Sequence, residues 1–149
     1  MAPPTKYFED FELGETFTIP SKTLTDAHFL FFAGLTGDNH PIHYDVEHAK
    51  RTRFGKPIAH GLLVASMTAA GASTLSPHTE GSIVAFLEQS SRFLKPVLLG
   101  DTIYPTLEVS ELVPKREVGV VRLRSQVKNQ RDEICLEGMH AYLIKKRPA

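Results

Sequence analysis

The pattern of hydrophobic and polar residues changes in character about halfway along the chain. Between residues 82 and 145, four runs rich in β-branched and aromatic residues are separated by turn-forming residues, which predicts four strands. The predicted strands cover residues 82–93, 102–113, 118–128 and 133–145. In the third, apolar or small residues alternate with charged or polar residues, so one face of that strand should be buried and the other solvated.

The first half of the chain predicts helices instead. Residues 15–25 alternate well enough for one strand, although Pro20 makes that strand bent or places it at an edge. Thr25 is a suitable N-cap for a helix with apolar residues at helical spacing, which should end between Gly34 and Gly37. A loop over residues 37–45 and a short helix over residues 46–51 should follow.

Residues 60–75 contain no charged residue and consist of Ala, Gly, Ser and Thr among larger apolar residues. A helix of this composition lacks a polar face and must be surrounded by protein. A curved antiparallel sheet wrapped around it would account for both patterns and predicts an α+β architecture. The chain shows no repeat or linker, so residues 1–149 should form one domain. The free edge of the sheet predicts pairing with a second copy in a homodimer.

Composition and charge narrow the range of partners. The chain has 17 basic and 17 acidic residues, a balance that argues against a nucleic-acid partner. Its single cysteine, Cys135, excludes an intramolecular disulfide, and no cysteine pair is present for structural zinc. No apolar run reaches membrane-spanning length, and the first residues lack the apolar core of a secretory signal. We therefore expect a cytoplasmic protein without a membrane partner.

The loop over residues 37–45 concentrates reactive side chains. Asp38, His40 and His43 lie in a loop whose backbone shape is restricted by Gly37 and Pro41. A carboxylate and an imidazole close to one water molecule can polarise it and move its protons. The alternative is that Asp38 caps the turn and His43 packs beneath it.

Three histidines in this region, His40, His43 and His48, also raise the question of a metal site. Their spacings of three and five residues do not form a compact helical ligand set, and no cysteine or Glu-x-x-His pair supports zinc. We therefore expect no metal.

A second candidate feature is the start of the helix predicted from residue 60. The first N–H groups of a helix have no intrahelical acceptor and can stabilise an oxygen that gains negative charge. Gly61 permits close approach to the backbone there. Ser66 can hold a catalytic side chain or bond back to its own helix. His60 can equally be an ordinary helix-start or interface residue.

These two segments resemble the MaoC-like, (R)-specific enoyl-CoA hydratase branch of the hot-dog fold. The family motif runs from an aromatic residue through a small residue to Gly-Asp-x-Asn-Pro, an aliphatic residue and His, with Ala or Ser further on. Residues 32–43 match it from Phe32 onward, with Ala49 closing the pattern, except that His40 occupies the usual Asn. Residues 53–66, RFGKPIAHGLLVAS, resemble the second landmark of the family. An imidazole is larger than an amide and can titrate, so His40 should affect loop geometry, substrate choice or the pH optimum.

The resemblance implies a hot-dog fold, an obligate dimer and reversible hydration of a trans-2-enoyl-CoA thioester, without metal or redox cofactor. Asp38 and His43 match the catalytic pair that activates water and moves a proton to the α-carbon. Gly61 matches the backbone donor that faces the thioester oxygen, and Ser66 matches a supporting serine near the pair. Phe32 can line an acyl tunnel or belong to the core.

Two alternatives have the same fold. In a thioesterase, water attacks the carbonyl carbon instead of the β-carbon. In a noncatalytic acyl-thioester-binding subunit, the fold persists and the chemistry is lost. An acyl-carrier-protein thioester is an alternative to acyl-CoA as the substrate.

Overall fold

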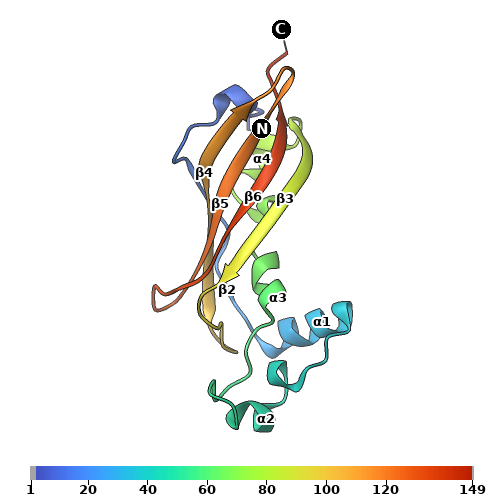
Figure 1. Ribbon diagram of the computed structural model, residues 1–149, viewed down its shortest axis with the longest axis vertical. Coiled ribbons are helices and arrows are strands. Elements are labelled where there is room, and N and C mark those ends of the chain that lie inside the picture. The colour runs from blue at the N-terminus through green and yellow to red at the C-terminus, as the bar shows by residue number, and fades with distance from the viewer. Residues whose placement is uncertain (1–2, 149) are drawn as a thin grey trace.

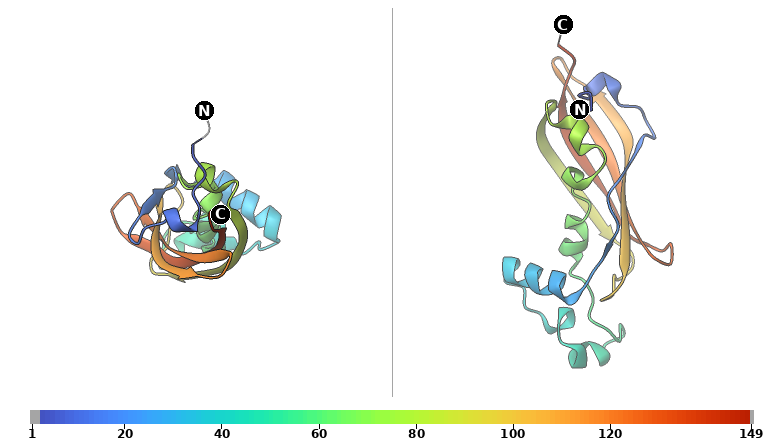
Figure 2. Two further views of the ribbon diagram at one scale, coloured as in Figure 1. Left: turned by 90° about the horizontal axis from the view of Figure 1, so that it is seen from above. Right: turned by 180° about the vertical axis from the view of Figure 1, so that it is seen from behind.

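The computed structural model describes residues 3–148. A curved antiparallel sheet lies along a helical segment, and two further helices lie at one end of the molecule (Figure 1). Seen end-on, the sheet curls around the helical segment (Figure 2). The chain enters and leaves at the end opposite these two helices, so the loops between them lie far from both termini.

Four long antiparallel strands make up most of the sheet. They are β3 (Ile83–Phe93), β4 (Thr102–Pro114), β5 (Val118–Asn129) and β6 (Ile134–Lys145). The strand order is β1-β4-β5-β6-β3, which leaves β3 at one edge. Leu123 and Val127 of β5 are buried whereas Arg124 is exposed, as the alternation in the sequence predicts. The four predicted strands and the α+β architecture are confirmed.

The strand predicted over residues 15–25 is divided into two short pieces. β1 (Thr16–Thr18) and β2 (Lys22–Thr23) both pair with β4. Pro20 lies between them and has no N–H to donate to a strand ladder. The strand is therefore interrupted at the proline, and β1 lies at the sheet edge, as predicted.

The helices at the end of the molecule also agree with the prediction from the sequence. α1 (Asp26–Thr36) begins after Thr25 and ends at Gly37, which has a left-handed φ of 77°. A 3-10 turn over Pro41–His43 and α2 (Val46–Lys50) follow. Within residues 3–148, no helix is long and apolar enough to cross a membrane.

The prediction of a single helix over residues 60–75 is wrong. The segment forms α3 (Gly61–Ser66), a 3-10 turn (Ala70–Ala72) and α4 (Ser76–Thr79). The hydroxyls of Ser66, Thr68 and Ser73 donate to carbonyls three residues earlier. Such bonds offer the backbone an alternative to the helix ladder. Burial is also incomplete, because Leu62 is 59% exposed in the single chain.

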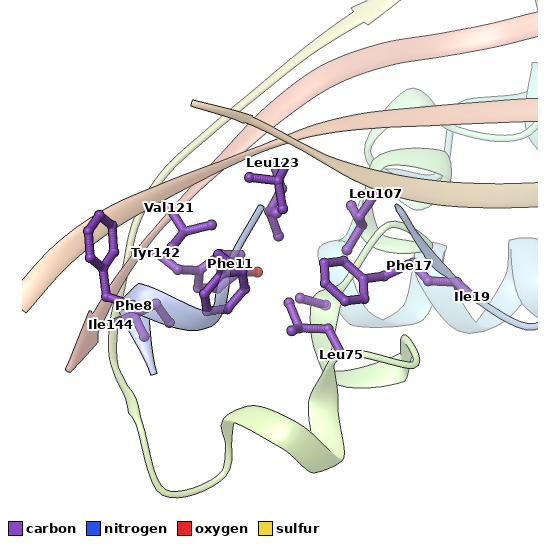
Figure 3. Close-up of a cluster of buried hydrophobic side chains, with 12 residues drawn as sticks. Phe8, Phe11, Phe17, Ile19, Leu75, Leu107, Val121, Leu123, Tyr142 and Ile144 are labelled. Atoms are coloured by element: carbon purple, nitrogen blue, oxygen red, sulfur yellow. The ribbon is translucent and has the colours of Figure 1, made fainter. Parts of the chain in front are cut away.

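Two groups of buried side chains form the core. The first lies between the inner face of the sheet and the segments that cross it (Figure 3). The second packs α1 and α3 against the sheet, and its members are Leu24, Phe29, Ala59, Leu63, Val64, Val97, Ile103, Val127, Cys135 and Leu136. This second group anchors the segments on either side of the loop that carries Asp38 and His43.

Candidate active site

Three polar side chains from separate segments meet beside α1. Asp38 follows α1, His43 ends the 3-10 turn, and His60 caps α3. One side-chain polar atom from each residue lies within 4.8 Å of the other two. The structure thus brings the predicted pair together and adds a third member.

The carboxylate of Asp38 accepts two hydrogen bonds within the chain. The backbone N–H of His40 donates to Oδ1 at 3.2 Å, and Nε2 of His60 lies 3.0 Å from Oδ2. The bond from the His40 backbone is the largest cause of a lowered pKa at Asp38, and the bond from His60 adds to it, whereas burial opposes the shift. Asp38 is therefore a carboxylate at neutral pH.

The hydrogen bonds of His60 determine where its ring proton lies. The N–H of Leu62 donates to Nδ1 of His60 at 3.0 Å, so Nδ1 carries no proton. A neutral imidazole must then carry its proton on Nε2, the nitrogen that faces Asp38. His60 therefore donates to the Asp38 carboxylate while it caps the start of α3.

A hydrogen bond to a backbone carbonyl determines where the ring proton of His43 lies. Its Nδ1 lies 2.7 Å from the carbonyl oxygen of Ile58, which can only accept a hydrogen bond. Nδ1 therefore carries the proton, and Nε2 of the neutral ring keeps a free lone pair. His43 is thus held in the tautomer that can act as a base at Nε2.

Two histidines and a carboxylate in one cluster also resemble a metal ligand set. Both ring nitrogens of His60 are occupied, however, because Nδ1 accepts from Leu62 and Nε2 donates to Asp38. A ligand nitrogen must be unprotonated and free. Asp38 and His43 alone supply fewer donors than the three protein ligands of a typical catalytic zinc site. In this arrangement the cluster does not fit a resident metal.

A small cavity of about 10 Å³ lies against these side chains. It is lined by Phe29, Phe32, Ala33, Asp38, His43, His60 and Leu63. A cavity of roughly 10 Å³ is about the smallest that holds one water molecule. The rest of the lining is apolar or, in His60, already hydrogen-bonded within the chain, so a water here would bond to Asp38 and His43.

Phe32 and Ser66 lie along an adjacent apolar groove of about 410 Å³. Phe32 lines both this groove and the small cavity, and its ring centroid is 5.0 Å from that of His60. The Ser66 hydroxyl donates to the carbonyl of Leu63 at 2.7 Å. The structure therefore places Ser66 along the groove, bonded back to its own helix, and not among the residues that line the small cavity.

Gly61 lines a different groove, of about 270 Å³, together with Arg53, Phe93 and Lys95. A Cβ at Gly61 would lie 3.1 Å from the Phe93 ring, so a larger residue would crowd that ring. As the first residue of α3, Gly61 has an N–H without an intrahelical acceptor. The N–H of the next residue, Leu62, already donates to His60, and α3 has only six residues, so the support expected from a long helix is missing.

His40 performs a backbone role that an asparagine can also perform. Its Nδ1 accepts from the N–H of Ile42 at 3.2 Å and caps the 3-10 turn. Asn is among the best capping residues, because its side-chain oxygen accepts the same kind of bond. The His40 ring also lies edge-on to His43 and His48, with centroids 6.3 and 5.8 Å away.

Comparisons with known proteins identify the family of this chain. The family model described as "MaoC like domain" matches residues 10–131. A 3-hydroxybutyryl-CoA dehydratase of Methylorubrum extorquens is 36% identical over 95% of this chain and 85% of its own length. An (R)-specific enoyl-CoA hydratase of Rhodospirillum rubrum is 32% identical over 95% of this chain and 93% of its own length. The chain belongs to the MaoC-like domain family.

Solved structures show the same fold. A protein from Archaeoglobus described as a monoamine oxidase regulatory protein has a TM-score of 0.92 and 42% identity, and the match covers 99% of both chains. The sheet wrapped around a helical segment is the hot-dog fold, as the resemblance implied.

The bond between His60 and Asp38 predicts a change in the titration of the carboxyl group. In His60→Ala, the pKa of Asp38 should rise toward its ordinary value, because a donor to the charged form is lost. The rise should be partial, since the bond from the His40 backbone remains. A carbon-13 NMR titration of the Asp38 carboxyl measures it, with His48→Ala as the control. Identical titrations in wild type and His60→Ala would contradict the assigned bond.

The capping bond of His40 predicts that His40→Ala lowers the free energy of unfolding more than His40→Asn does. His40→Ala removes the acceptor for the Ile42 N–H and should lower the free energy of unfolding by about 1 kcal/mol. His40→Asn should retain most of that stability, because the amide oxygen can accept the same bond. Urea unfolding followed by circular dichroism compares the three proteins. Equal losses in both variants would show that the ring itself is needed.

Proposed function

We propose that this protein is an (R)-specific enoyl-CoA hydratase, or 3-hydroxyacyl-thioester dehydratase, that reversibly adds water to trans-2-enoyl-CoA. The observation that carries the proposal is the pairing of the Asp38 carboxylate with the free Nε2 of His43 beside a cavity of one-water size. Relatives named as a dehydratase of 3-hydroxybutyryl-CoA and as an (R)-specific enoyl-CoA hydratase support this reaction and its stereochemistry.

The reaction proceeds as a balanced addition across one double bond. The water oxygen forms a bond to the β-carbon, while the electron pair of the double bond moves through the α-carbon to the thioester oxygen. Nε2 of His43 takes one proton from the water, and Asp38 accepts a hydrogen bond from the other. The His43 imidazolium then returns its proton to the α-carbon. The carboxylate stabilises that imidazolium in the interval.

A hydrogen-bond donor must stabilise the negative charge that develops on the thioester oxygen during this step. The N–H of Gly61 is the proposed donor, because it has no acceptor in its own helix and directly follows His60 in the chain. Removal of one such donor in well-studied enzymes costs about 3–4 kcal/mol of barrier. Gly61 and the Asp38–His43 pair should therefore act on the same thioester from different sides.

The two neighbouring grooves suggest how the substrate is held. The apolar groove beside Phe32 and Ser66 suits an acyl chain, because its lining is almost entirely hydrocarbon. The groove beside Gly61 contains Arg53 and Lys95, whose positive charges suit the phosphates of CoA. We include a cytoplasmic location in the proposal, since a single buried cysteine without a disulfide suits a reducing compartment.

A homodimer is also part of the proposal. β3 is the last strand in the sheet order, so one side of its backbone has no neighbouring strand among the described residues. Phe86 and Leu87 on this strand are 56% and 52% exposed, and Leu62 of α3 is exposed as well. A second copy that pairs its own β3 with this edge would cover these apolar side chains.

Replacement of the Asp38 carboxylate should abolish most of the hydration. Asp38→Asn keeps the size of the side chain and its acceptor for His60, but loses the charge that supports the imidazolium. The rate of loss of the conjugated enoyl absorbance of crotonyl-CoA should fall by about 100-fold or more. Asp45→Asn is the matched control, because Asp45 caps α2 and does not line the cavity.

The same assay separates hydration from the thioesterase alternative. A thiol reagent added to the reaction should detect no free CoA while the enoyl absorbance disappears. Turnover like that of wild type in Asp38→Asn would remove Asp38 from the mechanism. Thiol release without loss of the double bond in the wild-type protein would replace the proposed function by thioester hydrolysis.

Disruption of the β3 edge should convert the dimer to a monomer. Leu87→Lys places a charge within the proposed interface, so analytical ultracentrifugation should give twice the chain mass for wild type and the chain mass for the variant. Leu13→Lys, at an exposed position away from this strand, should remain dimeric. A wild-type protein that sediments as a monomer at micromolar concentration would refute the dimer, as would an undiminished dimer in Leu87→Lys.

A further inference from the structure

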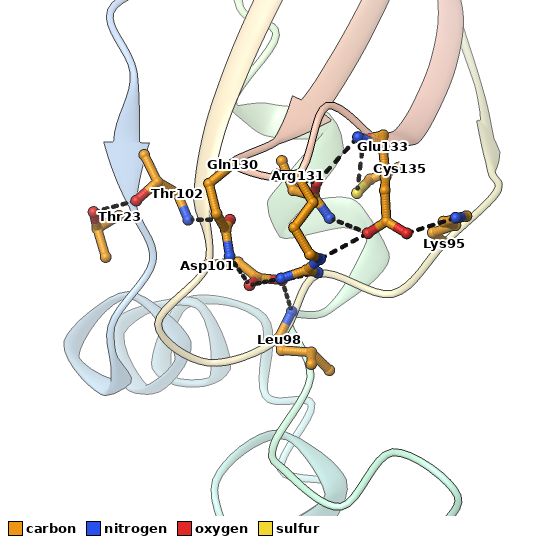
Figure 4. Close-up of polar contacts among 10 residues, drawn as sticks. Thr23, Lys95, Leu98, Asp101, Thr102, Gln130, Arg131, Glu133 and Cys135 are labelled. Atoms are coloured by element: carbon orange, nitrogen blue, oxygen red, sulfur yellow. Dashed lines mark hydrogen bonds and ion pairs between the residues drawn. The ribbon is translucent and has the colours of Figure 1, made fainter.

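A polar network surrounds the turn that leads into β4 (Figure 4). Asp101, which is only 4% exposed, accepts hydrogen bonds from Gln130 at 2.6 Å and from the N–H of Leu98 at 2.9 Å. Arg131 adds an ion pair to Asp101 at 3.2 Å, and its Nε donates to Glu133 at 2.9 Å. The network therefore ties the turn at residues 98–101 to the loop between β5 and β6.

The protonation of Asp101 is consistent with this arrangement. Burial, the largest influence on Asp101, raises its pKa, but the bonds from Gln130, Leu98 and Arg131 together outweigh burial and leave the pKa lowered. The charge is thus kept in a buried position by its partners. Loss of Arg131 would leave the carboxylate with neutral donors alone.

The residues before the Asp101 turn are hydrogen-bonded to the segment that leads into α3. Leu98 forms an isolated antiparallel bridge with Ile58. On either side of it, the N–H of Ala59 donates to Val97 at 2.8 Å, and the N–H of Leu99 donates to Pro57 at 2.9 Å. Residues 57–59 are therefore bonded along their length to the strand-like segment that ends in the Asp101 turn.

Residues 58–60 contact both members of the proposed catalytic pair. The carbonyl of Ile58 accepts the Nδ1 proton of His43, and His60, two residues on, donates to Asp38. A shift of the Ile58 carbonyl would release the bond that fixes the tautomer of His43. The path from Arg131 to His43 therefore runs through Asp101, the turn and the Ile58 carbonyl.

We propose that Asp101 and Arg131 are positioning residues, which hold residues 57–60 so that His43 keeps its proton on Nδ1 and presents Nε2 to the substrate. The catalytic meaning of this inference rests on the proposed function. The positioning is a property of the resting protein, so it can be tested without any substrate.

The test compares the ring protonation of His43 in three variants. Nitrogen-15 NMR of histidine distinguishes Nδ1–H from Nε2–H in the folded protein, well below each melting temperature. Wild type should show His43 with its proton on Nδ1. Asp101→Asn and Arg131→Met should shift His43 toward the Nε2-protonated form, and hydration kcat should fall by about tenfold with little change in KM.

Arg124→Met is the matched control, because it also removes one partially exposed arginine ion pair, with Glu108 at 2.8 Å, from the sheet. It should leave the His43 signal unchanged. If Asp101→Asn does not fold, Arg131→Met decides the outcome, since its side chain is 48% exposed and its loss leaves no cavity in the core.

The inference is overturned if His43 keeps its proton on Nδ1 in folded Arg131→Met, if Arg124→Met shifts it equally, or if wild-type His43 is protonated on Nε2. Failure of the proposed function gives a different result. In that case wild type does not hydrate enoyl-CoA, while the NMR comparison of the three variants still decides whether the network positions His43.

Discussion

The site depends on hydrogen bonds from one short segment, residues 58–60, to two side chains of a distant loop. The Ile58 carbonyl fixes the tautomer of His43, and the His60 ring supports the ionised Asp38. Without these bonds, an imidazole and a carboxylate on an exposed loop would have several arrangements available, few of them suited to one water molecule. The segment is itself paired with residues 97–99, which precede β4, so hydrogen bonds connect the site to the part of the chain that enters the sheet.

The sheet supports the candidate site, but the polar side chains of the site lie outside the sheet. Strands β4, β5 and β6 provide a frame with a dry inner face, and the polar side chains lie in connections at the end beside α1 and α2. Two grooves differ in character: Phe32 lines an apolar groove, and Gly61 lines a second groove together with Lys95. These two grooves suit the proposed thioester substrate, which has an apolar acyl chain and the anionic phosphates of CoA.

Local sequence signals predicted most of the fold. The alternation in β5, the N-cap Thr25 with Gly37 at the helix end, and Pro20 at the break between β1 and β2 all act within a few residues. The interruption after Ser66 was not predicted, because composition cannot show which hydroxyls bond back to carbonyls. For the site, the motif indicated Asp38 and His43, but the bond from His60 spans 22 positions and the Ile58 carbonyl belongs to an apolar residue without any chemical signature.

The central claim is that a water molecule held by Asp38 and His43 adds to a carbon–carbon double bond. The most direct measurement is the position of oxygen-18 after crotonyl-CoA reacts in labelled water, read by mass spectrometry of the products. The account predicts the label in the hydroxyl on the β-carbon, with the thioester to CoA intact. Label in a free carboxylate, accompanied by released CoA, would contradict it.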